Sequence, residues 1–191
     1  MSLPHALLGL LHYRPATGYE LKTAFNDSIH FFWDATLPQI YRTLNQMEEN
    51  GWLIAKVEHQ EKKPTKKIYR VTAAGIGELR RWLAEPVASA EPRLPTLIKV
   101  FFGSQMTRER LVDHLRQWRD QHAAMLEKFD KEVEPVIAQY GKLIGSPEEA
   151  RNWELTLDFG RRYARMVVDW CDAALASQKK GVPAPGKRRK S

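Results

Sequence analysis

The segment TLPQIYRTLNQMEENGW at residues 36–52, followed by LIAKVE at 53–58 and KIYRVT at 67–72, decides the fold. Thr36 and Gln39 have the spacing of a capping box, in which two side chains satisfy free backbone N–H groups at a helix start. Ile40, Leu44 and Met47 recur at helical spacing and predict a buried stripe. Gly51 supplies the left-handed residue that commonly ends a helix. The segment therefore predicts an amphipathic helix followed by two strands.

The outer face of this helix carries four polar side chains, none of them acidic: Gln39, Arg42, Thr43 and Gln46. All four can form hydrogen bonds with base edges in a DNA groove. Any amphipathic helix has a polar outer face, however, so this helix alone does not establish DNA binding.

The turn between the two strands is strongly basic. It reads EKKPTKK at residues 61–67 and carries Lys62, Lys63, Lys66 and Lys67. From Lys56 to Arg81 there are eight Lys or Arg and three Glu. A charge run is usually a solvated loop, but this one follows the polar-faced helix, at the place where a wing would lie along a phosphate backbone. Lysine neutralises phosphates by releasing counterions. The outline is that of a winged helix-turn-helix with a two-stranded wing.

The rest of the chain predicts a mainly α protein with two folded parts. Residues 1–85 form the winged helix-turn-helix, 86–97 a proline-containing linker, 98–180 an all-α domain, and 181–191 a disordered basic tail. Phe31, Phe32 and Trp33 are expected to plug the base of the first core or to line a ligand pocket. Thr72 is expected to cap a helix whose buried face carries Ile76, Leu79, Trp82 and Leu83. Residues 97–102 are expected to form an apolar turn.

Composition bounds the class of protein but does not identify it. The chain has 191 residues, 43% of them apolar, and a net charge of +7, of which the tail supplies four charges. No apolar stretch of the sequence approaches the length of about 20 residues that spans a bilayer. No secretion signal is visible. Cys171 is the only cysteine. A lone thiol fits a reducing compartment, so we expect a cytoplasmic protein that does not bind membranes.

The apolar faces of the C-terminal helices are too wide to be buried within one chain. Duplex-reading winged helices usually act as two-fold dimers over symmetric half-sites. We therefore expect a homodimer formed through residues 98–178.

Neither catalysis nor metal binding is indicated. The six histidines lack a metal-ligand spacing, and no nucleotide-binding glycine loop or Gly-x-Ser-x-Gly motif is present. We expect no enzyme and no cofactor, with Cys171 a buried structural thiol. A small aromatic effector is a candidate partner, since flat aromatic molecules stack on indoles. The candidate side chains are Trp33, Trp118, Trp153 and Trp170, although core or dimer packing explains each as well.

Four segments in order resemble the PadR family of bacterial transcriptional regulators, in the subgroup with a longer helical C-terminal domain. They are LLGLL (7–11) with GYEL (18–21), QIYRTL (39–44) with NGWL (50–53), KIYRVT (67–72) with Gly75 and Trp82, and LIKVFFG (97–103) with Tyr163–Trp170. Two positions depart from the family pattern. Arg42 stands where the family often has proline, so the operator sequence of the family is not carried over to this chain. Ala74 stands where the family often has an acidic residue.

The resemblance implies a dimeric, ligand-responsive repressor that binds double-stranded DNA at a palindromic promoter site. It implies DNA contacts by Tyr19, Lys22, Gln39, Tyr41 and Arg42, with Lys62, Lys63, Lys66 and Lys67 in the wing. By side-chain chemistry, Gln39, Arg42 and Thr43 suit base edges, whereas Tyr19, Lys22, Tyr41 and the wing lysines suit phosphates.

Two other classes of function stay open on the sequence. One is a winged-helix protein–protein interaction module without specific DNA binding, although such a surface would more often expose apolar anchors. The other is an RNA-binding adaptor, which is weakened because the sequence shows no aromatic strand platform for stacking bases.

Overall fold

The structure is a computed structural model that describes residues 2–30, 32–60, 63–86 and 94–179. The chain divides into two compact units, Met1–Ser89 with Tyr140–Ser146, and Ala90–Gln139 with Pro147–Ser191. The domain limits predicted from the sequence stay predictions. Most of the predicted linker at 86–97 and the whole tail at 181–191 lie outside the described residues.

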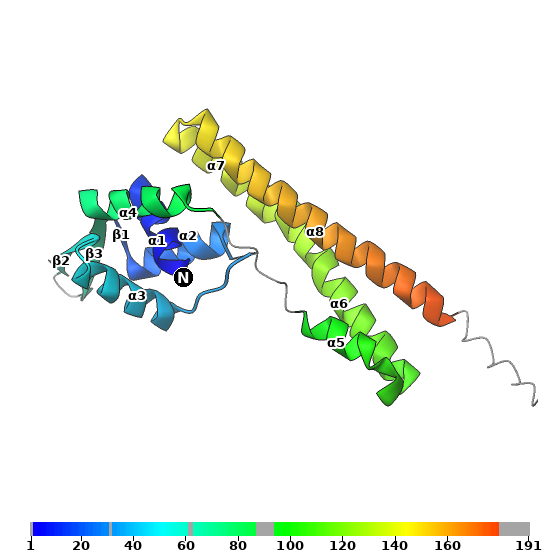
Figure 1. Cartoon of the computed structure of the whole chain (residues 1–191). Coiled ribbons are helices and arrows are strands. Elements are labelled where there is room, and N and C mark those ends of the chain that lie inside the picture. The colour runs from blue at the N-terminus through cyan, green and yellow to red at the C-terminus, as the bar shows by residue number, and fades with distance from the viewer. Residues whose placement is uncertain (1, 31, 61–62, 87–93, 180–191) are drawn as a thin grey trace, which may run out of the picture. The chain divides into compact units, whose positions relative to one another are not determined.

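The first unit is a winged helix-turn-helix (Figure 1). In chain order its elements are α1 (Leu3–Tyr13), β1 (Ala16–Thr17), α2 (Gly18–Ser28), α3 (Leu37–Glu49), β2 (Leu53–Gln60), β3 (Lys63–Val71) and α4 (Ala73–Ala84).

Side chains from all three leading helices form one apolar core. Its buried members include Leu7, Leu8, Leu11, Leu21, Phe25, Ile40, Leu44, Met47, Leu53 and Tyr69. The stripe predicted on α3 is therefore confirmed. Phe32 and Trp33 do not plug this core, because they are 51% and 42% exposed. From the connection after α2, Ala35 is buried in the core and Ile29 packs against it. Phe31 lies outside the described residues.

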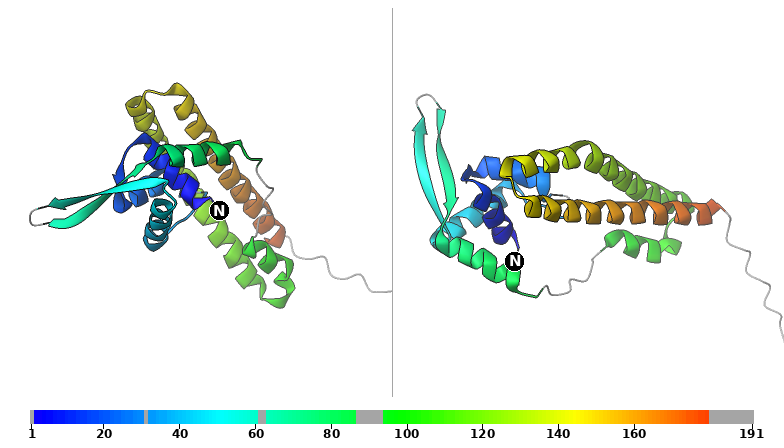
Figure 2. Two further views of the ribbon diagram at one scale, coloured as in Figure 1. Left: turned by 60° about the vertical axis from the view of Figure 1, so that its left-hand side comes forward. Right: turned by 90° about the horizontal axis from the view of Figure 1, so that it is seen from above.

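The sheet has three strands in the order β1-β3-β2, not only the two predicted for the wing. Leu53 pairs with Val71 and Ala55 with Tyr69, all antiparallel. The added strand, β1, pairs Ala16 with Tyr69 and Thr17 with Ile68. Figure 2 shows β2 and β3 as a long ribbon that extends away from the helices of this unit. The sheet thus fixes the base of the ribbon to the start of α2.

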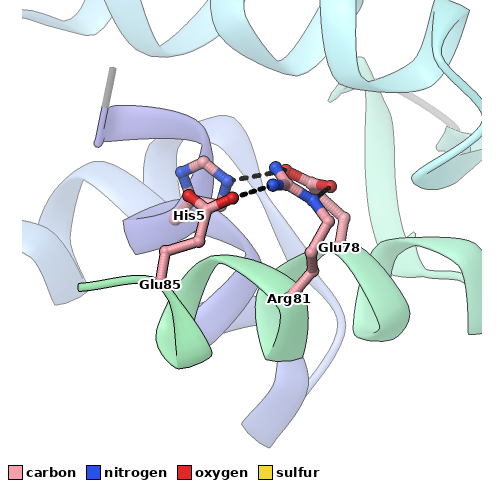
Figure 3. Close-up of polar contacts among 4 residues, drawn as sticks. All are labelled: His5, Glu78, Arg81 and Glu85. Carbon is pink, nitrogen blue, oxygen red and sulfur yellow. Dashed lines mark hydrogen bonds and ion pairs between the residues drawn. The ribbon is translucent and has the colours of Figure 1, made fainter.

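Helix α4 packs on α1 through a polar and aromatic cluster (Figure 3). Nε2 of His5 lies 2.9 Å from Oε1 of Glu78, and its ring stacks on Trp82 with centroids 4.5 Å apart. Arg81 binds Glu78 at 2.7 Å and also pairs with Glu85. Hydrogen bonds from Arg81 and His5 lower the pKa of Glu78 to about 2. The buried face predicted for α4 is wrong at Leu83, which is 65% exposed.

The second part of the chain is helical. Its elements are α5 (Pro95–Phe101), η1 (Gly103–Gln105), α6 (Arg108–Lys128), the π-helical segment η2 (Phe129–Val133), α7 (Glu134–Ile144) and α8 (Pro147–Lys179). Helix α5 replaces the apolar turn predicted at 97–102 and begins inside the range predicted as linker. Pro95 explains this start, since proline is tolerated in a first helical turn.

Helices α6 and α8 lie side by side (Figures 1 and 2). The buried residues of this part include Leu115, Phe129, Leu157, Val167 and Cys171. Burial raises the pKa of the Cys171 thiol, as expected for a structural cysteine. Helix α8 also leaves apolar side chains uncovered, because Leu155, Phe159, Met166 and Trp170 are 39–67% exposed. No helix in the described part of the chain is long and apolar enough to cross a membrane.

Candidate nucleic-acid interface

The start of α3 is held by the predicted capping pair. Oε1 of Gln39 accepts hydrogen bonds from the backbone N–H of Thr36 at 2.8 Å and from its hydroxyl at 3.0 Å. The Gln39 amide nitrogen keeps its two donors, but the oxygen is engaged. A bidentate contact with adenine uses both groups, so it would require Gln39 to give up the two bonds to Thr36.

The outer face of α3 is open to a ligand. Arg42 and Gln46 are exposed and Thr43 is half-buried, whereas Ile40 and Leu44 on the opposite face are fully buried. The structure therefore brings three of the predicted base-reading side chains onto one accessible surface.

Two tyrosines flank this surface. Tyr41 is 41% exposed and Tyr19, in the first turn of α2, is 69% exposed. The Tyr41 ring lies directly on Gly18, where an added Cβ would stand only 2.4 Å from Cε1 of the ring. Gly18 thus allows α2 and α3 to approach closely and sets the position of Tyr41.

The start of α2 is capped in the same manner as that of α3. The Thr17 backbone N–H donates to Oε2 of Glu20 at 2.7 Å, and Glu20 N–H donates to the Thr17 hydroxyl at 3.2 Å. The bond from the Thr17 backbone is the largest cause that lowers the pKa of Glu20. This second capping box fixes the turn that presents Tyr19.

Lys22, for which the resemblance implied a DNA contact, forms a hydrogen bond within the protein. It is half-buried, and its Nζ donates to the carbonyl oxygen of Ala35 at 2.6 Å. The bond joins α2 to the residue before the α3 cap.

The wing lysines fall into two groups. Lys66 is exposed on β3. Lys67 donates to Oε2 of Glu48 at 2.7 Å, and Nζ lies 5.2 Å from the centroid of the Tyr69 ring. The hydrogen bond to Glu48 raises the pKa of Lys67. Lys62 and the side chain of Lys63 lie outside the described residues.

Two of the four candidate tryptophans lie together. Trp118 and Trp170 meet edge to face, with ring centroids 5.6 Å apart. His122 joins this pair, 5.7 Å from Trp118, and its Nδ1–H donates to the Trp118 carbonyl at 2.9 Å. Trp153 lies half-buried elsewhere on α8, and Trp33 belongs to the first unit. Only Trp118 and Trp170 stay together as candidates for an effector.

Sequence reasoning missed three residues that shape this surface: Gly18, Ala35 and Glu48. Glu48 carried a usable signal, because a carboxylate in the last turn of α3 needs a cation and the basic strand follows at once. Ala35 carried none, since its role depends on a backbone carbonyl thirteen residues from Lys22.

The exposed helix beside a basic antiparallel ribbon defines the class of winged-helix DNA-binding proteins. Comparison with known families agrees with this class. The model of the transcriptional regulator PadR-like family matches residues 7–81, and that of the virulence activator alpha C-terminal region matches residues 92–178.

Individual relatives agree with the family models. A probable transcriptional regulator of Mycobacterium tuberculosis is 47% identical over 92 residues, which cover 48% of this chain and about half, 49%, of that protein. The crystal structure of Bacillus subtilis PadR in complex with operator DNA is 26% identical, covers 93% of this chain and 99% of that one, and has a TM-score of 0.76.

A third relative, the Vibrio cholerae virulence activator AphA, is 28% identical, with 94% and 99% of the chains covered and a TM-score of 0.70. Bacillus subtilis PadR has also been solved with p-coumaric acid; at 24% identity that likeness concerns the fold alone.

Residues 7–81 form a domain of the PadR-like family of transcriptional regulators, and the extra helical region fits the longer subgroup. The family is one of regulators and not of enzymes, as the sequence predicted.

Proposed function

We propose that this regulator is a homodimer that binds a palindromic promoter site in double-stranded DNA and represses transcription. The observation that carries the proposal is the exposed, non-acidic outer face of α3 beside a ribbon with exposed Lys66. One named relative supports parts of it, since Bacillus subtilis PadR is called a negative transcriptional regulator and was solved with operator DNA. The protein would act in the cytoplasm, where a bacterial chromosome lies.

Within this proposal the side chains divide by chemistry. Arg42 reads guanine, and Gln39, Thr43 and Gln46 reach neighbouring base edges. Tyr19 and Tyr41 with Lys62, Lys63 and Lys66 bind phosphates and set the register. Lys22 and Lys67 are left out of this set, because their ammonium groups already bind the protein itself.

The dimer is proposed to form through residues 98–178. Leu155, Phe159, Met166 and Trp170 follow one another at helical spacing on α8 and are exposed in the single chain. An exposed apolar stripe of this kind marks a protein interface. We propose that the second copy covers it, which would place two recognition helices on symmetric half-sites.

The experiment that tests DNA recognition is selection of duplexes from a random-sequence pool by the purified chain, followed by affinity measurements over a range of salt. A regulator of this kind should enrich an inverted repeat and bind it more weakly as salt rises. Enrichment of no sequence, with affinity independent of salt, would favour a protein-interaction module instead.

A small aromatic effector is the proposed signal, and Trp118 with Trp170 is its candidate contact. Aromatic molecules that stack there should quench tryptophan fluorescence. Phenolic acids form a suitable first panel, with Trp118→Leu as the variant that should lose the response, because Trp118 lies outside the stripe proposed for the dimer. Quenching unchanged in that variant would remove this pair as the contact.

A further inference from the structure

Two lysines that the sequence assigned to phosphates bind the protein instead, one at each end of α3. Lys22 donates to the carbonyl of Ala35 at 2.6 Å, and Lys67 donates to Glu48 at 2.7 Å. We propose that Lys22 and Lys67 are positioning residues that hold the two ends of α3 for DNA reading and make no phosphate contact. This inference rests on the proposed function, because it explains how the DNA-reading helix α3 is held in place.

At the N-terminal end, the bond from Lys22 satisfies a carbonyl in the apolar core. Ala35 is only 2% exposed, and it precedes the N-cap Thr36, so its carbonyl lies before the α3 ladder. Buried backbone carbonyls need a partner. Because Lys22 lies on α2, the bond joins the two helices of the helix-turn-helix where the connection enters α3. The Thr36–Gln39 pair then sets the first turn.

At the C-terminal end, the carboxylate lies on α3 and the ammonium group on the wing. Glu48 is in the last turn of α3, and Lys67 lies on β3 opposite Val57. The ammonium group of Lys67 also lies over the ring of Tyr69, which is 2% exposed. The pair therefore connects the end of the reading helix to the base of the ribbon, and the Tyr69 ring connects it to the core.

The ammonium group of Lys67 adds little to DNA binding through counterion release, because the Glu48 carboxylate balances its charge before DNA arrives. Lys22 keeps its charge, because its partner is a neutral carbonyl, but reaching a phosphate would break the bond to Ala35. Fixing a helix at both ends does contribute to recognition, because base contacts require side chains placed within about 0.5 Å of their working geometry. The expected result of losing either bond is therefore a loss of sequence discrimination and not of general attraction to DNA.

Lys66 offers a matched control. It neighbours Lys67, is exposed, and points to the opposite face of the strand because side chains alternate. We would compare Lys22→Met, Lys67→Met and Lys66→Met for binding to a fluorescent duplex selected by the unchanged chain and to an unrelated duplex of equal length. Affinity would be measured over a series of KCl concentrations. Circular dichroism would verify folding, with Lys22→Gln as the second variant should Lys22→Met unfold.

Lys66→Met should lower the slope of log affinity against log salt by about 0.9, the value for one phosphate of B-DNA, and keep the ratio between the two duplexes. Lys22→Met and Lys67→Met should keep the slope and reduce that ratio several-fold. In the chain without DNA, Lys22→Met should also speed amide hydrogen exchange at Thr36 and Ile40, whose N–H groups are hydrogen bonded at the start of α3.

Glu48→Gln provides a readout that a merely structural residue would not change. It leaves Lys67 in place and frees its charge, so the salt slope should steepen by up to about 0.9 while discrimination falls. If the salt slope fell by about 0.9 in Lys22→Met and Lys67→Met while the ratio between the two duplexes was kept, the positioning role would be overturned and the proposed function would stand. If the unchanged chain selected no duplex and showed no salt-dependent binding, the proposed function would fail, and the positioning role with it.

Discussion

Replacing Phe159 by alanine should weaken the proposed dimer without unfolding the single chain. The Phe159 residue is 67% exposed in the isolated chain, which for an aromatic side chain of about 200 Å² leaves about 130 Å² for a partner to cover. Burying this area in both protomers is worth up to about 6 kcal/mol at about 25 cal/mol per Å². Alanine keeps part of the surface, so we expect a loss of about 4 kcal/mol, or about a thousandfold in the dimer dissociation constant.

The assay is sedimentation equilibrium over a wide range of protein concentration. Glu154→Ala serves as the control, because Glu154 is exposed on the same helix but away from the apolar stripe. The control should dimerise as the unchanged chain does. A dissociation constant for Phe159→Ala within about threefold of the control, or an unchanged chain that is a 22 kDa monomer, would refute the assignment of this face to a second copy.

Three further predictions concern the first unit. Arg42→Ala should relax preference at one base pair by about 1–3 kcal/mol, measured by competition with single-base operator variants; unchanged preference would remove Arg42 from base reading. Gly18→Ala should destabilise the unit by about 1–3 kcal/mol in urea melts, because the new Cβ would overlap the Tyr41 ring, and an unchanged midpoint would mean that the ring moves freely. Glu78→Gln should lower stability at neutral pH. Because the folded-state pKa of Glu78 is about 2, below its ordinary value, the contribution is present above about pH 4.5 and is lost as pH falls through about 2, so the two stability curves should converge there. Parallel curves down to that pH would show that the bonds to Arg81 contribute nothing.

The elements with local signals could be predicted from the sequence. The capping pair at Thr36, the buried stripe of α3 and the positive φ of Gly51 each depend on residues within a few positions of one another, and the structure has all three. The cap predicted at Thr72 is of the same kind and is also present.

The features that depend on distant partners could not be predicted. Two-residue β1 has no pattern of its own and exists because Ile68 and Tyr69 lie opposite it. Leu83 and Phe159 sit at apolar positions of their helices, yet the single chain leaves them exposed, since helical spacing does not say what lies opposite. The residues of the candidate site also fall into a predictable and an unpredictable group. The outer face of α3 follows from spacing, whereas the partner of Lys22 follows only from the fold.

The sole cysteine provides a reporter for one half of the molecule. Cys171 is fully buried, and the raised pKa keeps its sulfur protonated, so alkylating reagents should reach it only when α8 detaches from its neighbours. Residues 1–89 contain no second thiol. The alkylation rate therefore reports the opening of the helical half alone and is independent of any unfolding of the winged half.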